Sequence, residues 1–303
     1  MSAPSCCATR IRRCTTRPMA CSPMTAQPAI TYTVLGADGF VGRRLAEHLR
    51  AAGHAVYAPA RGDPALFQRA LGRVIYCAGL TADYALRPFD TVQAHVGLLA
   101  KVLQEARFEH LVYLSSTRLY DSLGAHAGVP VDEHAALLLN PHEARHLYDL
   151  SKALGENLCL HAADGRAAVA RLACVYDWSP GAPGFLSDWL QRAMRAKTLH
   201  LDSSGGVVRD YIHLDDVVAA LAAMAARCSS GVVNVASGEQ VSNAELAQVF
   251  RRHGWSVNLA RDSAREHPAP CTVERLAQLG VTPRPVRAVV EYCLGTEAWR
   301  AAD

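Results

Sequence analysis

The chain has 303 residues, of which 50% are hydrophobic and 19% are charged, and its formal charge is +3 at pH 7. This composition is that of a globular protein, because chains that are disordered throughout have too few apolar residues to build a core. No stretch reaches the roughly 18 consecutive apolar residues that a bilayer span needs. A chain of this length can bury the core of an enzyme, as one large domain or as two closely packed ones.

The first 29 residues differ from the rest in composition. The first acidic residue of the chain is Asp38. Residues 1–29 contain four arginines, and without these four the formal charge changes from +3 to −1. Four of the ten cysteines also lie here: Cys6, Cys7, Cys14 and Cys21. Their spacing matches no zinc motif, and the segment lacks the apolar stretch of a secretory signal. We predict that residues 1–29 are a disordered extension or precede a true start at Met19 or Met24, with a transit peptide as the alternative.

The remaining composition bears on partners and location. The six other cysteines show no pairing pattern, which favours a reducing cytoplasm over a secreted, disulfide-bonded fold. The chain after residue 29 is nearly neutral and has no basic stripe or aromatic platform, so we expect no nucleic-acid partner. We also expect no membrane association.

From Ile30 onward, predicted strands and helices alternate. Strands are expected at 30–35, 55–58, 74–77 and 111–114, and helices at 40–52 and 89–107. This alternation predicts an α/β fold with a doubly wound, Rossmann-like parallel sheet. Later elements are expected as a helix at 144–161, an extended run at 167–175 and helices at 215–226, 242–252 and 286–294. The less regular last third predicts a smaller, mixed C-terminal lobe.

A glycine-rich turn joins the first predicted strand to the first helix. Gly36, Gly39 and Gly42 are three residues apart, and Phe40 and Val41 lie between the last two. Because glycine has no Cβ, the first permits a tight turn, the second lets a pyrophosphate approach the backbone and the third lets the helix pack on the strand. The amides of the helix then face the anion. We predict dinucleotide binding here, with a merely structural turn as the alternative.

The end of the second strand indicates which dinucleotide binds. An acidic side chain there accepts hydrogen bonds from a free ribose 2′-hydroxyl, whereas an arginine pairs with a 2′-phosphate. The expected position holds Ala60, Arg61 follows it, and Asp63 lies two residues further on. We therefore expect NAD or NADP, with a lean to NADP through Arg61. The alternatives are that Asp63 curls back to the ribose and that Arg61 is an ordinary solvated loop residue.

A second motif places a tyrosine and a lysine on one helix face. Tyr148 and Lys152 are four residues apart, and Ser115 and Ser116 end a predicted strand about thirty residues earlier. A phenol has a reference pKa near 10, so a neighbouring ammonium favours its deprotonated form. A serine hydroxyl at the carboxyl end of a strand can hydrogen-bond the substrate oxygen that the tyrosine protonates or deprotonates. The pattern predicts a Ser-Tyr-Lys catalytic set, in which the tyrosine moves a proton.

With these motifs in place, the sequence resembles the extended short-chain dehydrogenase/reductase family, which contains nucleotide-sugar epimerases and dehydratases. The resemblance covers about Ile30 to Leu294 and rests on the segments GADGFVG, VIYCAG, YLSSTRLY, YDLSK, RLACVYD and RDYIHLDD. It implies a dinucleotide-binding domain over 30–176 with a returning segment at about 209–236. It also implies a substrate lobe formed by 177–208 and 237–303.

The resemblance also implies roles for individual residues. The pyrophosphate is lined by Gly36, Gly39, Phe40, Val41 and Gly42. Ala78 and Gly79 border the adenosine half of the cofactor, and Ser116, four residues before Tyr120, matches the catalytic hydroxyl better than Ser115 does. Arg209 matches an arginine that contacts the diphosphate of a sugar nucleotide, with a salt bridge to a local acid such as Asp210 as the alternative.

Several positions depart from the family pattern. The segment between the second and third strands is short, as if a strand had been trimmed, so Asp63 can also be matched to an adenine-contacting acid. Thr117 and Arg118 stand where 4,6-dehydratases carry an Asp-Glu pair, which disfavours dehydration. His95 replaces an Asn, and Cys174 stands at a substrate position where many members have an Asn. We expect Cys174 to be a small buried residue without redox or nucleophilic chemistry.

A zinc-protease motif also matches literally. His142, Glu143 and His146 form H-E-x-x-H, in which two histidines on one helix face bind the metal. The longer form of the motif requires Gly and His where this chain has Asp149 and Lys152, and the motif lies at the very start of its predicted helix. We therefore expect no metal site.

Together these observations predict an NAD(P)-dependent enzyme that oxidises or reduces a hexose carbon, C4 in the first instance, of a nucleotide sugar. Ser116, Tyr148 and Lys152 are its expected catalytic residues. An epimerase and an NADPH-dependent 4-ketosugar reductase use the same set, and a non-catalytic dinucleotide sensor is an alternative from another class. We expect a cytoplasmic homodimer.

Overall fold

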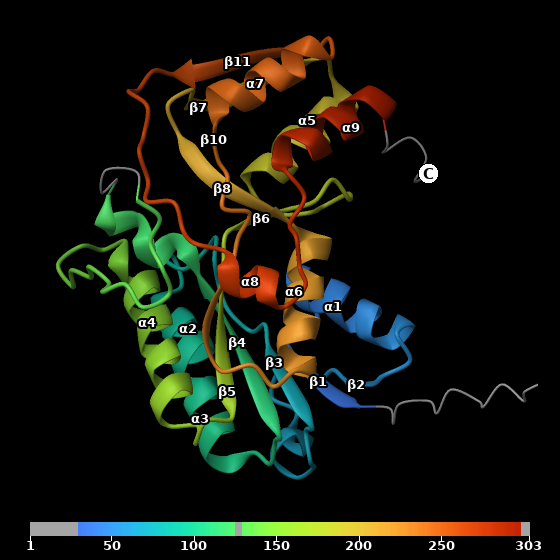
Figure 1. The fold of residues 1–303 in the computed structure, drawn as a ribbon, viewed down its shortest axis with the longest axis vertical. Coiled ribbons are helices and arrows are strands. Elements are labelled where there is room, and N and C mark those ends of the chain that lie inside the picture. The colour runs from blue at the N-terminus through green and yellow to red at the C-terminus, as the bar shows by residue number, and fades with distance from the viewer. Residues whose placement is uncertain (1–29, 125–128, 298–303) are drawn as a thin grey trace, which may run out of the picture.

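The computed structural model describes residues 30–124 and 129–297, and its largest element is a six-stranded sheet (Figure 1). The strands lie in the order β2-β1-β3-β4-β5-β9, and every neighbouring pair is parallel. Their bounds are β1 Thr31–Leu35, β2 Ala55–Tyr57, β3 Arg73–Tyr76, β4 His110–Ser116, β5 Ala167–Leu172 and β9 Gly231–Val235. The predicted doubly wound, Rossmann-like parallel sheet is confirmed.

Helices cover both faces of this sheet (Figure 1). One face carries α1, Phe40–Ala51, and α6, Leu214–Ala226; the other carries α2, Pro88–Val92, α3, Leu98–Glu105, and α4, His146–His161. Successive residues of a strand alternate between the two cores: Ile75 packs in the core with α1 and α6, whereas Val74 and Tyr76 pack in the core with α3 and α4. Burial on both faces explains why these strands read as nearly continuous apolar runs.

A smaller lobe lies beyond the carboxyl ends of these strands (Figure 1). It contains a sheet of β10, Gln240–Ser242, β8, Val208–His213, and β6, Cys174–Tyr176, and a parallel pair of β7, Thr198–Ser204, and β11, Ser256–Arg261. Its helices are α5, Phe185–Arg195, α7, Asn243–Arg252, and α9, Val286–Thr296. Trp189, Phe250 and Trp255 lie in a core of its own. The short helix α8, Glu274–Gln278, packs against β9 of the large sheet.

The chain passes between the lobes at two places that matter for the site. The run expected to be extended over 167–175 is two strands, because β5 ends at Leu172 in the large sheet and β6 begins at Cys174 in the small one. β6 pairs in parallel with β8, which leads directly into α6 on the large sheet. Cys174 and Arg209 are thereby placed in the small lobe, facing the end of the large sheet.

One predicted helix needs correction, and the short segment from which a strand was expected to be missing contains none. The helix expected over 89–107 is interrupted, because Gln93–Gly97 form a π-helical turn between α2 and α3. Such turns often occur at functional sites, and this one buries His95 completely. The short segment between β2 and β3 contains a single 3₁₀ turn, Pro64–Phe67, so β2 is the edge strand of the described sheet.

The predictions made for residues 1–29 lie outside the described residues. Among the described residues, no helix is both long enough and apolar enough to cross a bilayer.

Candidate active site

The glycine turn between β1 and α1 is shaped by close backbone contacts. Gly36 has φ +81°, and a Cβ atom added to it would lie 2.8 Å from the backbone nitrogen of Ala78. The amide of Gly39 donates to the carbonyl of Gly36 at 3.1 Å. A Cβ atom on Gly42 would overlap the same carbonyl oxygen, so only glycine lets α1 pack this closely on the turn. Gly36 and Gly42 therefore each have a steric reason at their positions.

The amino end of α1 is open to an anion. Its N-cap is Gly39, which offers no capping side chain, and the first turn, which begins with Phe40 and Val41, contains no acidic residue. The unsatisfied amides of a helix start carry a partial positive charge that favours phosphate groups. The turn thus fits the pyrophosphate of a dinucleotide.

The chain after β3 lies next to this turn. Ala78 touches Gly36, and a Cβ atom on Gly79 would lie 3.1 Å from His95 Nε2 and 3.4 Å from Lys152 Nζ. The chain after β3 therefore runs from the glycine turn to the predicted catalytic lysine, although these residues are more than 100 positions apart in the sequence. Small residues at 78 and 79 keep this path open.

The two candidates for the ribose contact differ in their freedom. The carboxylate of Asp63 accepts hydrogen bonds from the Tyr57 hydroxyl at 2.8 Å and from the Ala65 amide at 2.9 Å. The hydrogen bond from Tyr57 is the main cause that lowers the pKa of Asp63. Arg61 is exposed and makes no hydrogen bond or ion pair with the residues that the structure describes. Asp63 is therefore held by its own loop, whereas Arg61 is free to meet a ligand.

Ser116, Tyr148 and Lys152 come together at the carboxyl end of β4. Ser116 is the last residue of β4 and caps the following 3₁₀ turn, Thr117–Leu123, by accepting from the Arg118 amide at 3.2 Å. Tyr148 is 4% exposed and hydrogen-bonds the side chains of Ser116 and Thr81. Lys152 is 5% exposed, and its Nζ donates to the carbonyl of Leu114 at 2.8 Å.

Burial controls the protonation of this set. Burial raises the pKa of Tyr148, while the hydrogen bonds from Ser116 and Thr81 and the charge of Arg118 act in the opposite direction. Burial lowers the pKa of Lys152 to about 7, and the nearby carboxylate of Glu156 opposes that shift. Burial thus places the pKa of this lysine close to neutral pH.

His95 connects the π-helical turn to the tyrosine helix. Its Nε2 accepts from the Leu80 amide at 3.2 Å, which leaves Nδ1 as the donor to Ser151 Oγ at 2.8 Å. Ser151 in turn donates to the backbone carbonyl of Tyr148 at 2.8 Å. Burial lowers the pKa of His95 to about 3, so the imidazole is a neutral structural link. Nothing in the motif patterns indicated this chain of contacts.

Arg209 and Cys174 face the site from the small lobe. The Arg209 guanidinium lies 4.7 Å from the ring centroid of Phe185, and its Nη1 is buried without a hydrogen-bond partner. The alternative of an Asp210 salt bridge is wrong, since that carboxylate accepts from the Ser237 amide and hydroxyl and from the Gly238 amide. A buried guanidinium nitrogen without a partner fits an anionic ligand.

The expectation that Cys174 is buried is wrong. Its side chain is exposed, because Cys174 begins β6 and burial along this short strand is complete only at Tyr176. The protein atoms around it nevertheless raise the pKa of its thiol to about 11, so it stays protonated near neutral pH. A protonated thiol is a poor nucleophile.

A family model described as the NAD dependent epimerase/dehydratase family matches residues 32–236. The chain belongs to this family. A protein of Oryza sativa subsp. japonica named "Putative GDP-L-fucose synthase 2" is 28% identical over 218 residues, which are 65% of this chain and 62% of that protein. The match thus spans less than two thirds of the length of this curated relative.

Solved structures share the fold at low sequence identity. MoeE5 in complex with UDP-glucose and NAD has a TM-score of 0.69 and 21% identity, over 90% of this chain and 100% of that chain. UDP-glucose 4-epimerase from Thermotoga maritima, with UDP-glucose, has a TM-score of 0.70 and 18% identity over 90% and 99% of the two chains. RMD from Pseudomonas aeruginosa, complexed with NADPH, has a TM-score of 0.67 and 22% identity over 88% and 98%.

The zinc-protease motif has a different geometry from the one its spacing requires. In this family member α4 begins at His146, so His142 precedes the helix and the two histidines do not share a helical face. His142 and Glu143 are exposed as expected, but His146 is 3% exposed. Its Nδ1 accepts from the Asn140 amide at 2.7 Å and its Nε2 lies 3.2 Å from Ser122 Oγ. Both ring nitrogens are therefore engaged within the protein.

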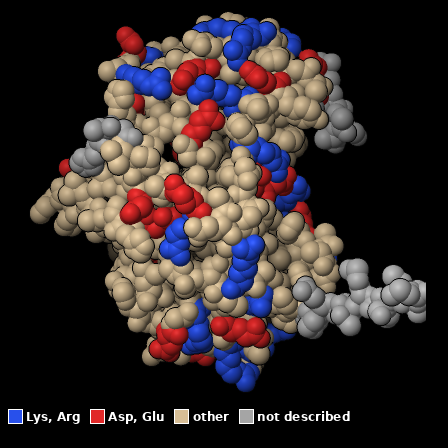
Figure 2. Space-filling view, viewed as in Figure 1, with Lys and Arg blue, Asp and Glu red and all other residues tan. Residues whose placement is uncertain are grey.

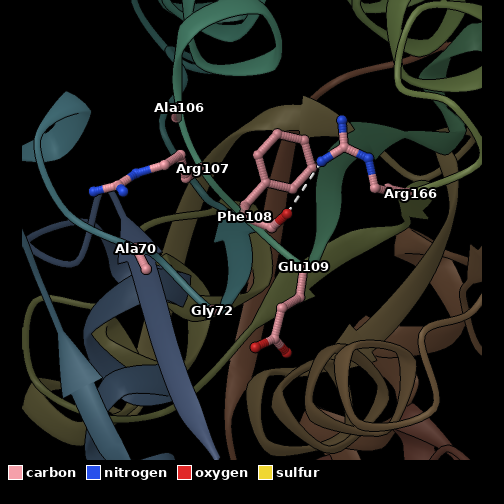
Figure 3. Close-up of a pocket in the computed structure, with 7 residues that line it drawn as sticks. All are labelled: Ala70, Gly72, Ala106, Arg107, Phe108, Glu109 and Arg166. Carbon is pink, nitrogen blue, oxygen red and sulfur yellow. Dashed lines mark hydrogen bonds between the residues drawn. The ribbon is translucent and has the colours of Figure 1, made fainter.

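A hollow lies at the opposite end of the strands of the large sheet (Figure 3). Its residues precede β3, β4 and β5, whereas ligands of open α/β sheets bind beyond the carboxyl ends of the strands. Arg166 donates to the carbonyl of Phe108 at 3.1 Å, and Arg107 to that of Gln68 at 2.7 Å. On the face shown in Figure 2, charges of both signs are interspersed. Neither feature competes with the glycine turn and tyrosine helix as the site.

Proposed function

We propose that this protein is an NAD(P)-dependent nucleotide-sugar oxidoreductase or epimerase that acts at a hexose carbon, with C4 as the favoured position. The observation that carries the proposal is the buried Tyr148 phenol, which hydrogen-bonds Ser116 and lies on the same helix face as Lys152. The residues after β3 link this set to the glycine turn of β1 and α1, because Ala78 packs against Gly36 and Gly79 lies close to Lys152. The family to which the chain belongs supports the same reading.

In this proposal, each residue has a separate task. Tyr148 removes the proton of a sugar hydroxyl or returns one to a keto oxygen, and Ser116 orients that oxygen. Lys152 holds the nicotinamide ribose and favours the deprotonated phenol. The nicotinamide, when bound, supplies or accepts the hydride. Arg209 pairs with the diphosphate of the nucleotide sugar, in accord with its unpartnered buried nitrogen.

The substrate class is supported by the relatives. Two structures with the same fold contain UDP-glucose, and the curated relative is named for a GDP-sugar reaction. Both sugars are carried by a nucleoside diphosphate, the group that Arg209 suits. Loss of water is disfavoured, because a cation, Arg118, stands where the dehydratase pattern has a carboxylate.

An NADPH-dependent 4-ketosugar reductase is the second candidate. The observation that favours it is the exposed Arg61 beyond β2, which can pair with a 2′-phosphate, while Asp63 is engaged by Tyr57 and Ala65. Native mass spectrometry of the purified protein separates the two candidates. Retained NAD supports the epimerase, and NADP(H) that exchanges freely supports the reductase.

We also propose a cytoplasmic homodimer. Large apolar side chains are exposed on and just before α2 and on the adjacent α4: Leu86, Phe89, Val92, Leu154 and Leu160. Contact with a second copy would remove this apolar area from water. The cysteines of the described residues are all free, which suits a reducing compartment.

The decisive experiment compares Tyr148→Phe with a matched control, Tyr292→Phe, whose ring is 60% exposed on α9. Each protein is assayed with NAD(H) and NADP(H) against a panel of UDP- and GDP-hexoses and their 4-keto derivatives. Tyr148→Phe should bind the dinucleotide as the wild type does but lose at least about a thousandfold in kcat, and the control should retain full activity. Wild-type turnover that survives in Tyr148→Phe contradicts the mechanism. A wild type that binds dinucleotide but converts no sugar of the panel supports the sensor instead.

A further inference from the structure

Arg118 is fixed between two aromatic rings at the site. Its Cζ lies 4.9 Å from the ring centroid of Tyr84 and 5.1 Å from that of Tyr148. Its Nη2 donates to the Tyr84 hydroxyl at 2.9 Å. Its Nε lies 3.2 Å from Oδ1 of Asp149, whose side chain is 2% exposed. These contacts come from two segments, the loop that holds Tyr84 and the helix α4, and they leave the guanidinium little freedom to move.

The same contacts constrain Tyr148 itself. Tyr84 belongs to the loop between β3 and α2, and its ring centroid lies 5.4 Å from that of Tyr148. On another side, the His95 ring packs edge-on against the Tyr148 ring, with 5.3 Å between the ring centroids. Arg118 thus joins the loop after β3 to α4, and the phenol ring is held among these groups.

Two cations face Tyr148, and they differ in how firmly they hold their charge. Lys152 Nζ lies 6.0 Å from the ring centroid, donates to Leu114, and has its pKa lowered to about 7 by burial. The guanidinium of Arg118 keeps its proton at every working pH. The opposing anion is Asp149, which Arg145 also approaches at 3.8 Å. Arg118 is therefore a cation beside the phenol whose charge does not change with pH.

Other groups packed against Tyr148 add no charge near neutral pH. The pKa of His95 is lowered to about 3, chiefly by burial, so this imidazole is neutral. Tyr84 contributes its ring, and Ser116 and Thr81 contribute hydrogen bonds. Outside the Tyr-Lys pair, Arg118 and Asp149 are the charged groups that act on Tyr148 directly, and Asp121 and Arg145 act on those two in turn.

We propose that Arg118 is a positioning residue for Tyr148, which it holds in place through Tyr84 and Asp149 while its fixed charge favours the deprotonated phenol. This inference rests on the proposed function, in which Tyr148 moves the proton. It assigns a task to a residue that the motifs marked only as a departure from a dehydratase pattern. Lys152 keeps its proposed contact with the nicotinamide ribose.

The experiment uses three variants and two readouts. Removing the charge in Arg118→Met should raise the pKa of Tyr148, because a cation that favours the phenolate is lost. Asp149→Asn should lower that pKa, because an anion that disfavours the phenolate is lost, and Arg118→Lys should leave it near the wild-type value. In the oxidative direction the phenolate is the base, so the acidic limb of kcat/KM moves with this pKa. We expect about one pH unit upward for Arg118→Met.

The second readout is independent of turnover. The ¹³Cζ signal of Tyr148, assigned by its absence in Tyr148→Phe, is followed by NMR against pH in each protein. The proposal is supported if the titration midpoint is lowest in Asp149→Asn, intermediate and similar in the wild type and Arg118→Lys, and highest in Arg118→Met. Equal midpoints in Arg118→Met and the wild type overturn it, even if activity falls. If the order holds but no nucleotide sugar is converted, the proposed function has failed and the inference about Arg118 stands.

Discussion

Glu156 and Arg171 form a buried ion pair that ties the tyrosine helix to the large sheet. Arg171 on β5 donates to Glu156 on α4 through Nε at 2.9 Å and Nη2 at 2.6 Å. The two side chains are only 4% and 5% exposed. Arg171 also donates to the Tyr120 hydroxyl at 2.6 Å and to the carbonyl of Glu133 at 3.4 Å. Glu156→Gln removes the anion and keeps the shape, so it isolates the charge.

The expected cost follows from leaving a guanidinium buried without its counter-ion. Removal of one partner from a buried pair costs about 3–5 kcal/mol. Because the Gln oxygen of Glu156→Gln can still accept one hydrogen bond from Arg171, we expect about 3 kcal/mol. Domains have total stabilities of about 5–15 kcal/mol, so this is a large fraction. At about 2–4 °C per kcal/mol for a chain of this size, Tm should fall by about 6–12 °C.

The assay is urea unfolding followed by far-UV circular dichroism, with the m-value checked for constancy. The matched control is Glu291→Gln, since Glu291 pairs with Arg252 at the surface, where the side chains are 44% and 63% exposed. An exposed pair contributes about 0–1 kcal/mol. A double variant that carries Glu156→Met and Arg171→Met leaves neither charge buried without a partner. Its loss in free energy of unfolding should therefore be smaller than the sum of the losses of the two single variants. Equal costs for Glu156→Gln and Glu291→Gln, or additive costs in the double variant, would refute the reasoning.

Two further predictions concern the cofactor turn and the apolar face. Gly42→Ala should weaken dinucleotide binding, measured by calorimetry, at least about tenfold, because its Cβ would overlap the Gly36 carbonyl. The control is Gly295→Ala in α9, where a Cβ meets only ordinary contacts. Equal affinities of the two variants would contradict the steric argument. Phe89→Asp should convert the proposed dimer to a monomer, as measured by light scattering. Tyr292→Asp, also at an exposed ring, should leave the dimer intact. A dimer that survives Phe89→Asp places the interface elsewhere.

Local patterns were sufficient for much of the fold. The strand, turn and helix from Thr31 to Ala51 are encoded within about twenty consecutive residues, by an apolar run, a glycine spacing and a helical period. The run at 167–175 shows the limit of this approach. Both of its halves are extended, and only their partners differ, since β5 pairs with β4 and β9 while β6 pairs with β8. A local pattern carries no information about which sheet a strand joins.

The exposure of Cys174 and the burial of His95 could not be predicted for a related reason. A small apolar thiol suits a core, but Cys174 begins a short strand along which burial is complete only at Tyr176. The imidazole of His95 is buried because its partners, Leu80 and Ser151, come from other segments and satisfy both ring nitrogens. Spacing along the chain shows neither partner. Burial of a polar side chain depends on such long-range contacts.

The tyrosine motif shows how spacing and burial divide the explanation of the site. Tyr148, Lys152 and Glu156 are each four residues apart, so one face of α4 presents a phenol, an ammonium and a carboxylate in a row. The spacing predicts that they are neighbours, but it does not predict their charge states. Burial lowers the pKa of Lys152, and the carboxylate of Glu156, itself compensated by Arg171, limits that shift. Burial thus brings the pKa of the lysine that is expected to prime the tyrosine to about 7, against the opposing effect of Glu156. A fixed cation such as Arg118 beside the phenol makes the base less dependent on that balance.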